Sequence, residues 1–295
     1  MTFKSRPLET IKEPRMIRPL LRDVLHSLRG SPIFALFVII TLAIAGVIAG
    51  MTAVMIVQPG FMGMAHFSEL SHRTHDLTYG FIFTTIVVGI LAQLRRPTTN
   101  IAGMVVALIP GAALLLAAVL STDASVILSA ERVAVIAMAV FAALLHPAGG
   151  AFFRSFSVSR VNWVMLALVS VAAIPLIAFA ATNIRLQATL LDAHAGAGHY
   201  GFMAAFSFTV IAVGVLASLR PDGWRLAAWV AGILPALLGV TSLVYPDSSS
   251  SLDLVWAFAA ISWGAVFVVT AELTRSTAAT ARLGSPGSLS TSERG

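Results

Sequence analysis

The stretch FTTIVVGILAQLR at residues 83–95 recurs in slightly altered form as FTVIAVGVLASLR at residues 208–220. Both copies are predominantly apolar, both hold a glycine at the same place (Gly89 and Gly214), and both end on an arginine. An apolar run that stops at a cationic residue is typical of a helix that crosses a membrane and ends at its cytoplasmic surface. The stretch therefore predicts a transmembrane helix that occurs twice in the chain.

The two copies are 125 residues apart, and the same offset pairs Pro110 with Pro235, each in the middle of another apolar run. A glycine, a terminal arginine and a proline that match in one register indicate an internal duplication. Each half would hold an even number of helices, so the halves would share one orientation about an axis along the membrane normal. We expect both prolines to kink their helices.

The whole chain fits this interpretation. Of its 295 residues 58% are hydrophobic and only 11% are charged, and the mean hydropathy is +0.90. A soluble domain carries about 25% charged residues. Eight apolar segments are each long enough to span a bilayer. They cover residues 33–57, 76–94, 101–120, 127–146, 161–181, 200–219, 226–245 and 254–273. The predicted fold is an all-α integral membrane protein with eight transmembrane helices in two tandem four-helix repeats.

The net charge of +6 lies mainly in the tails and in alternate loops, which indicates orientation and not nucleic-acid binding. Arginines follow every even-numbered segment: Arg95 and Arg96, Arg154 and Arg160, Arg220 and Arg225, and Arg275 and Arg282. The positive-inside rule then places both termini in the cytoplasm. We expect the protein in the plasma (inner) membrane of a bacterium, in contact with the lipid bilayer and possible partners in a membrane complex.

Four regions follow from this layout. Residues 1–32 would form a cytoplasmic tail with a basic amphipathic helix, lying either on the membrane surface or on the protein itself. Residues 33–148 and 149–273 would be the two repeats, and residues 274–295 a disordered cytoplasmic tail.

Histidines mark one face of the predicted protein. Five of the seven fall on the expected outer side, close to the starts of the second and sixth helices: His66, His72, His75, His194 and His199. Neutral imidazole is a preferred ligand of haem iron and copper. We expect His72, His75, His194 and His199 to form a cofactor site for haem or copper. The alternative is that each histidine simply sits at the water boundary.

The loop before the second helix adds further ligand types. Met62, Met64, His66 and Glu69 stand close to His72 in sequence. Thioether and imidazole groups together form a plausible ligand set for Cu(I), so these four are candidate metal ligands.

The residues Glu69-Leu70-Ser71-His72-Arg73 resemble the Glu-x-x-His-Arg motif at the same place in haem A synthases. Members of that family also have eight helices in two four-helix halves. The resemblance implies that His72 is a haem ligand and Glu69 a catalytic-type carboxylate, with His194 or His199 as the sixth-helix ligand. This chain differs from the family because no histidine stands near the outer ends of the expected fourth and eighth helices.

Several classes of site are excluded. The chain has no cysteine, so it has no thiolate ligand and no disulfide. Its two lysines, Lys4 and Lys12, precede the first helix, so a retinal Schiff base within the bundle is excluded. The expected helix interiors hold essentially no ionisable groups, which disfavours an ion-coupled pump.

Three functions remain open. The first is a haem- or copper-binding membrane protein that handles a cofactor or transfers electrons at the outer face. The second is a permease for a small neutral solute, and the third is a non-catalytic scaffold subunit of a membrane complex. No catalytic motif decides whether the protein is an enzyme.

Overall fold

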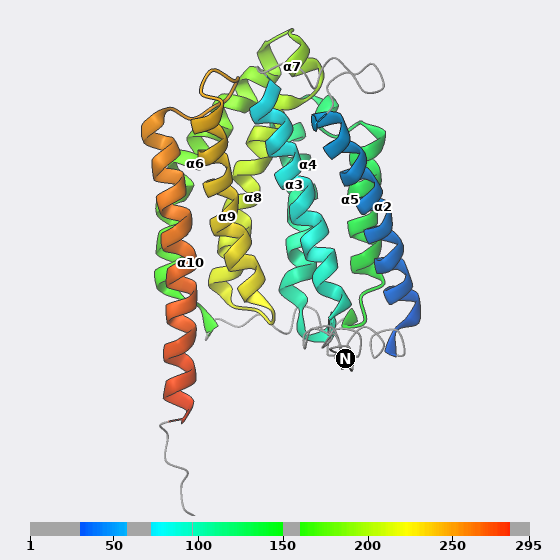
Figure 1. The fold of residues 1–295 in the computed structure, drawn as a ribbon, viewed down its shortest axis with the longest axis vertical. Coiled ribbons are helices and arrows are strands. Elements are labelled where there is room, and N and C mark those ends of the chain that lie inside the picture. Colours follow the sequence, from blue (N-terminus) through cyan, green and yellow to red (C-terminus); the bar gives the residue numbers. More distant parts are fainter. Residues whose placement is uncertain (1–29, 58–71, 96, 150–159, 284–295) are drawn as a thin grey trace, which may run out of the picture.

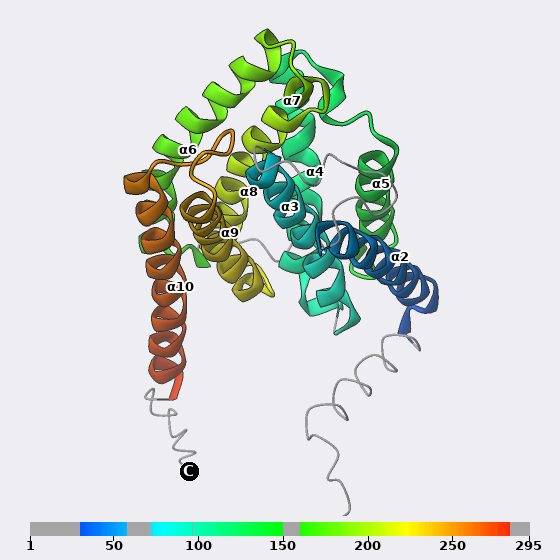
Figure 2. The same ribbon diagram turned by 45° about the horizontal axis from the view of Figure 1, so that its top comes forward.

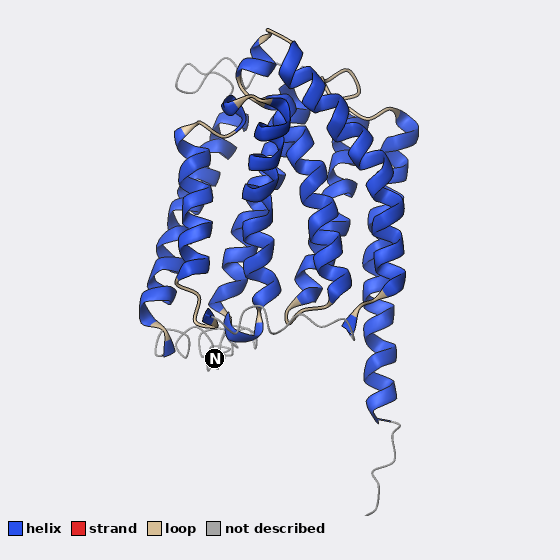
Figure 3. Cartoon of the chain, turned by 180° about the vertical axis from the view of Figure 1, so that it is seen from behind, coloured by secondary structure: helices blue, strands red, loops and turns tan. Residues whose placement is uncertain are grey.

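The computed structural model describes residues 30–57, 72–95, 97–149 and 160–283, and every regular element among them is a helix (Figure 3). The long helices are α2 (Pro32–Val57), α3 (Arg73–Leu91), α4 (Ile101–Ser121), α5 (Ala130–Leu144), α6 (Trp163–Thr189), α8 (His199–Leu219), α9 (Trp224–Val244) and α10 (Leu254–Leu283). The short ones are η4 (Ala92–Leu94), η5 (Pro97–Thr99), η6 (Ala124–Val126) and α7 (Ala193–Gly196). The expected amphipathic helix lies outside the described residues.

The long helices follow the apolar segments closely, and the cases in which a helix extends beyond its segment have a common cause. Helix α6 continues to Thr189 and α10 to Leu283, both beyond the ends of their apolar segments. Hydropathy marks where a chain leaves the lipid, but a helix ends where its backbone hydrogen bonds end. Helix α7 was not expected, because a single turn in a polar segment has no periodic signal.

Six of the described helices are long and apolar enough to cross a membrane: α3 extended through Leu94, α4, α6, α8, α9 and α10 up to Arg275. Their outer faces carry large exposed apolar side chains, such as Ile174 (73% exposed) and Val255 (74% exposed). Side chains of this kind on so much of the surface need lipid around them. The protein is therefore an integral membrane protein that contacts the bilayer.

Helix α8 lies at the centre of the bundle, between α6, α4 and α9 (Figures 1 and 2). Its apolar side chains are buried on nearly every side, and Met203 and Phe206 are fully enclosed. A helix that is apolar all round belongs in an interior. Because α8 begins with His199, the histidine region is built onto the most buried of the six candidate membrane spans.

Glycines allow the helices to approach closely. A Cβ added to Gly89 on α3 would lie 2.6 Å from the carbonyl oxygen of Gly103 on α4. A Cβ on Gly232 of α9 would lie at the same distance from the carbonyl oxygen of Gly264 on α10. Small residues at helix crossings are a common means of association in membranes, where no hydrophobic effect drives helices together.

The two ends of the bundle differ. Helix α7 and the starts of α3 and α8 lie at one end, called the α7 end here, whereas α2 begins and α10 ends at the opposite end (Figure 1). At the opposite end the buried side chain of Gln93 donates to the backbone oxygens of Gly89 and Asn100, and its oxygen lies 3.1 Å from His146 Nε2. His146 is therefore part of a structural network far from the other described histidines.

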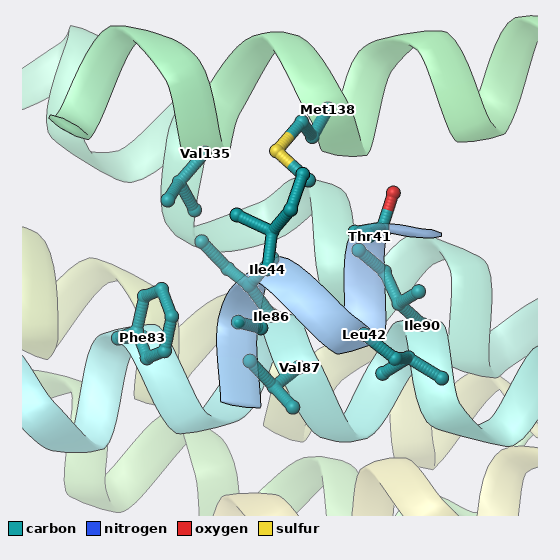
Figure 4. Close-up of a pocket in the computed structure, with 10 residues that line it drawn as sticks. Thr41, Leu42, Ile44, Phe83, Ile86, Val87, Ile90, Val135 and Met138 are labelled. Carbon is teal, nitrogen blue, oxygen red and sulfur yellow. The ribbon is translucent and has the colours of Figure 1, made fainter. Parts of the chain in front are cut away.

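Helix α2 packs beside α3 and α5 and leaves a small cavity of about 20 Å³ between them (Figure 4). Ile44, Phe83 and Val135 are among the side chains that line it. An apolar space of this size is a packing gap rather than a ligand site.

Candidate functional site

Three elements position the candidate site at the α7 end. His72 and His75 lie at the start of α3, His194 lies on α7, and His199 begins α8. Gly198 links α7 to α8 with a φ of +76°, a conformation that suits glycine. A Cβ there would also lie 3.0 Å from the backbone of Ser125. This tight link keeps His194 and His199 on neighbouring turns that both face α3.

The four imidazole rings form one cluster. The ring centroids of His72 and His194 are 4.0 Å apart and their planes are 7° from parallel. The centroid of His199 lies 5.3 Å from that of His72 and 5.2 Å from that of His75. His194 lies 5.2 Å from His75 and 5.9 Å from His199. Residues far apart in the sequence thus meet at one point, which we call the histidine cluster (His72, His75, His194 and His199).

The histidine cluster is shielded from solvent. His75 is fully buried, His72 and His199 are 4% and 7% exposed, and the side chain of His194 is 15% exposed. Polar rings at the edge of a membrane normally turn toward water. Packing that hides four of them together indicates a specific arrangement and not a chance gathering at the water boundary.

A run of four serines, Ser248–Ser251, lies in the loop between α9 and α10 and contacts the start of α3 and one ring of the cluster. Ser250 Oγ lies 3.1 Å from His75 Nε2 and donates to the side-chain oxygen of Asn183 on α6 at 2.8 Å. Ser248 Oγ accepts from the backbone N–H of Thr74. The Thr74 hydroxyl lies 2.9 Å from Ser251 Oγ. These contacts fix the start of α3 and the orientation of the His75 ring.

The sequence analysis missed this serine loop. The run of serines in an expected outer loop was the available signal, but loops of serine are common and their partners lie far away in the chain.

Asp192 organises the other side of the cluster. Its carboxylate accepts from the backbone N–H of Ala195, which caps α7, and from the hydroxyl of Tyr200 on α8. The Ala195 N–H donor holds the pKa of the Asp192 carboxyl below its ordinary value. Asp192 Oδ2 also lies 4.0 Å from Nδ1 of His194. A carboxylate therefore faces one nitrogen of this ring.

Two further side chains tie α7 and α8 to the rest of the protein. Gln187 at the end of α6 donates to Asp123 and to the backbone oxygen of Ala195, and its own oxygen accepts from the N–H of Gly201. Arg132 on α5 donates to the backbone oxygen of Ala197 and lies 4.2 Å above the ring of Phe202. The α7 end is thereby held by α5, α6 and α8 together.

Two ring nitrogens of the cluster stand out. Nδ1 of His75 and Nε2 of His194 are buried, and neither has a hydrogen-bond partner among the described residues. The other nitrogen of His75 lies within hydrogen-bond distance of Ser250, whereas that of His194 is 4.0 Å from Asp192. In the ring orientations of the structure, no three His, Asp or Glu side chains of the described residues are arranged to hold a metal ion.

The structure brings together the four histidines expected to form the cofactor site. The other candidate ligands, Met62, Met64, His66 and Glu69, lie outside the described residues. No protein family, curated protein or solved structure matches this chain. The fold and the histidine cluster therefore carry the functional argument alone.

Proposed function

We propose that this protein binds copper at the histidine cluster and handles copper or transfers electrons at the outer face of the membrane. The observation that carries the proposal is the His75 ring, whose Nε2 lies 3.1 Å from Ser250 Oγ while its buried Nδ1 has no hydrogen-bond partner among the described residues. The buried Nε2 of His194 also has no such partner there, although its Nδ1 is 4.0 Å from Asp192, which is too long for a hydrogen bond. Histidines that ligate metals usually have this pattern, because an outer partner fixes the tautomer and leaves the second nitrogen for the ion.

The ring separations support a single ion. Around one metal ion with metal–nitrogen distances of about 2.0–2.1 Å, the centres of neighbouring imidazoles lie roughly 4.5 Å apart in a square plane and roughly 5 Å apart in a tetrahedron. The separations in the cluster run from 4.0 to 5.9 Å, on both sides of these values. Because the present ring orientations do not converge on one point, binding requires the imidazoles to rotate within the cluster.

Imidazole nitrogens suit copper, zinc, nickel and iron alike. We choose copper among them because, of the divalent first-row ions, Cu²⁺ binds most tightly to a given nitrogen site. The Asp192 carboxylate, 4.0 Å from His194, would offset part of the charge of the ion without touching it.

Haem is the second candidate, since the resemblance to haem A synthases implies His72 as a ligand. A haem needs its whole macrocycle between the axial rings. Rings as close as those of His72 and His194 leave no such space, so haem binding would require the cluster to open. A visible absorption spectrum of protein from haem-replete cells distinguishes the two candidates.

Metal analysis tests the proposal. Purified protein is dialysed against Cu²⁺, and against Zn²⁺ in parallel, and bound metal is counted. We expect about one Cu²⁺ per chain, with a loss of at least tenfold in affinity for His75→Asn and for His194→Asn. His146→Asn is the matched control, because His146 lies at the opposite end of the bundle. Protein that stays metal-free, or binding that is equally weakened by His146→Asn, contradicts the proposal.

We further propose that α2 and α5 also span the membrane, which gives eight spans in two tandem repeats with both termini in the cytoplasm of a bacterium. The helix order supports this, since α3 and α4 are matched by α8 and α9 at an offset close to 125 residues. The histidine cluster would then face outward. Reporter fusions after Arg96 and Arg220 should report from the cytoplasm, and fusions after Asp123 and Asp247 from the outer side.

The permease alternative receives less support. A carrier needs polar side chains in the bundle that are available to its solute. The hydroxyls of Thr85, Ser207 and Thr209 donate to the backbone of their own helices, whereas those of Thr41 and Thr78 are buried without a hydrogen-bond partner among the described residues. Such back-bonding satisfies the hydroxyl hydrogen without any solute.

A further inference from the structure

A large groove lies on the membrane side of the second half of the protein, between α6, α9 and α10. Its volume is about 680 Å³, and Pro175 and Phe179 of α6, Leu238 of α9, and Trp256 and Trp263 of α10 are among the side chains that line it. Ligand pockets in proteins usually measure about 300–1,000 Å³. The groove is therefore large enough for a small molecule, unlike the packing gap beside α2.

The shape of the groove follows from how α6 and α10 meet. Near the opposite end of the bundle they are joined, because Asn162 donates to the Thr274 hydroxyl and the Trp263 indole donates to the backbone oxygen of Leu168. Toward the α7 end the two helices diverge (Figure 2). The groove fills this divergence and is open to the lipid.

The length of the groove fits a molecule with an apolar tail and a headgroup. On α6 the lining runs from Val171 to Thr182, which at 1.5 Å per residue is about 16 Å. This is roughly half of a ~30 Å hydrocarbon core. Alanines at positions 172, 178, 259 and 260 make room along the walls.

The chemistry of the lining changes along its length. No lining residue is charged, so the lining offers no ionic partner to an occupant. The part farther from the α7 end is aliphatic apart from Trp263, whereas Phe179, Thr182 and Trp256 lie nearer the α7 end. Aromatic side chains offer faces on which a flat ring stacks. The Thr182 hydroxyl donates to the backbone oxygen of Ala178, and its lone pairs remain able to accept a hydrogen bond.

The head end of the groove adjoins the histidine cluster. Thr182 is followed by Asn183, which accepts a hydrogen bond from Ser250, the partner of His75. Leu252, another lining residue, is two positions after Ser250 in the serine loop. A ligand head in the groove would thus lie beside a hydrogen-bonded path to the cluster.

We propose that this groove binds an isoprenoid quinone or quinol, with the apolar tail along α6 and α10 and the ring between Phe179 and Trp256. The occupant follows from three features together: a neutral lining, an elongated apolar part, and an aromatic end with a hydroxyl. This goes beyond copper binding and does not depend on it, because none of the histidines lines the groove.

Tryptophan fluorescence offers a direct test, because quinones quench indole emission and two of the five tryptophans line the groove. The probe is a benzoquinone with a ten-carbon alkyl tail, added to the full-length protein in detergent. We expect saturable quenching with about one site per chain. Trp256→Phe and Trp263→Phe should each reduce the quenching amplitude.

Blocking variants locate the site. Ala260→Phe on α10 fills the groove, and Ala172→Phe fills it from α6, so each should weaken binding by at least tenfold. Ala265→Phe is the control, because Ala265 is exposed on the same helix and does not line the groove. The two blocking substitutions lie on different helices, so if one variant folds poorly the other still tests whether the groove binds the quinone. Melting curves show whether either variant has a folding defect.

A second ligand tests the ring. Decanol, which has a similar tail and no ring, should compete with the quinone only at concentrations at least about tenfold higher. Thr182→Val should weaken quinone binding several-fold. If decanol competes as well as the quinone, or if Ala265→Phe weakens binding as much as Ala260→Phe does, the groove is an ordinary lipid contact and the proposal is wrong.

Discussion

The rings of His72 and His194 stack face to face, with centroids 4.0 Å apart and planes 7° from parallel. His72 precedes the first turn of α3 and His194 lies on the single turn of α7. One contact therefore joins the two halves of the chain at the α7 end. It also places two potential metal ligands against each other.

Substitutions at His72 separate its packing role from its role as a ligand. His72→Phe keeps a flat ring against His194, whereas His72→Ala leaves a hole. We expect the alanine variant to lose about 1–3 kcal/mol of metal-free stability relative to the phenylalanine variant. Both should lose copper affinity, because neither supplies a nitrogen. Thermal unfolding with and without Cu²⁺ measures the two effects, and copper affinity that survives in His72→Phe would remove His72 from the ligand set.

Ser250 tests whether its contact with the His75 ring matters for metal binding. Its φ of +62° is a conformation that favours glycine, and its hydroxyl contacts both His75 and Asn183. Ser250→Gly relieves the backbone strain and removes the hydroxyl. We expect unchanged or higher thermal stability together with copper affinity that is about 10-fold lower, as is usual when a residue that hydrogen-bonds a metal ligand is replaced. Ser249→Ala next to it is the control, and equal effects from both substitutions would argue against a role in orienting His75.

Asp192 should make the stability of the α7 end depend on pH in the acid range. Because its pKa in the folded protein is lower than the usual value of 3.8, its contribution to stability is present above about pH 4 and is lost as the pH falls further. Asp192→Ala also removes the cap of α7 and should cost about 1 kcal/mol. Asp192→Asn keeps an acceptor for the cap without the charge. Hydrogen exchange of the amides of Ala193–Gly196 measures the effect, and exchange there that is equal in all three proteins would contradict it.

Much of the fold is predictable from the sequence because the membrane imposes a simple rule. An apolar run of sufficient length becomes a helix, since lipid offers no other partner for backbone polar groups. Helix bounds such as those of α4 and α8 lie within one residue of the apolar segments for this reason. Helices of polar residues outside the lipid, such as the last turns of α6, follow no such rule.

The histidine cluster was predictable in part. Five histidines on one expected side indicated a site, and four of them meet in the structure. The partners of the cluster were not predictable, because Ser250 and Asn183 reach it only through the packing of α6 and the loop before α10. No local sequence pattern around either residue predicts a contact between residues so far apart in the sequence.

Gly89 tests the packing of the bundle. In Gly89→Ala the new methyl group would meet the backbone of α4, 2.6 Å from the carbonyl oxygen of Gly103 and 2.7 Å from the nitrogen of Ala107. We expect a loss of about 1–3 kcal/mol of stability from this overpacking. Gly80→Ala on the same helix is the matched control, because nothing lies within 4 Å of its added Cβ. It should be neutral or slightly stabilising through helix propensity, so a melting temperature that falls equally in both variants would contradict this packing.

The number of imidazoles on one bound Cu²⁺ tests the central claim most directly. Pulsed electron paramagnetic resonance of the copper-loaded protein resolves the couplings from imidazole nitrogens. The account predicts at least three imidazoles on a single ion, with one fewer in His75→Asn and one fewer in His194→Asn. Copper that couples to one imidazole or to none, or that gives the same spectrum in both variants as in the unsubstituted protein, would contradict it.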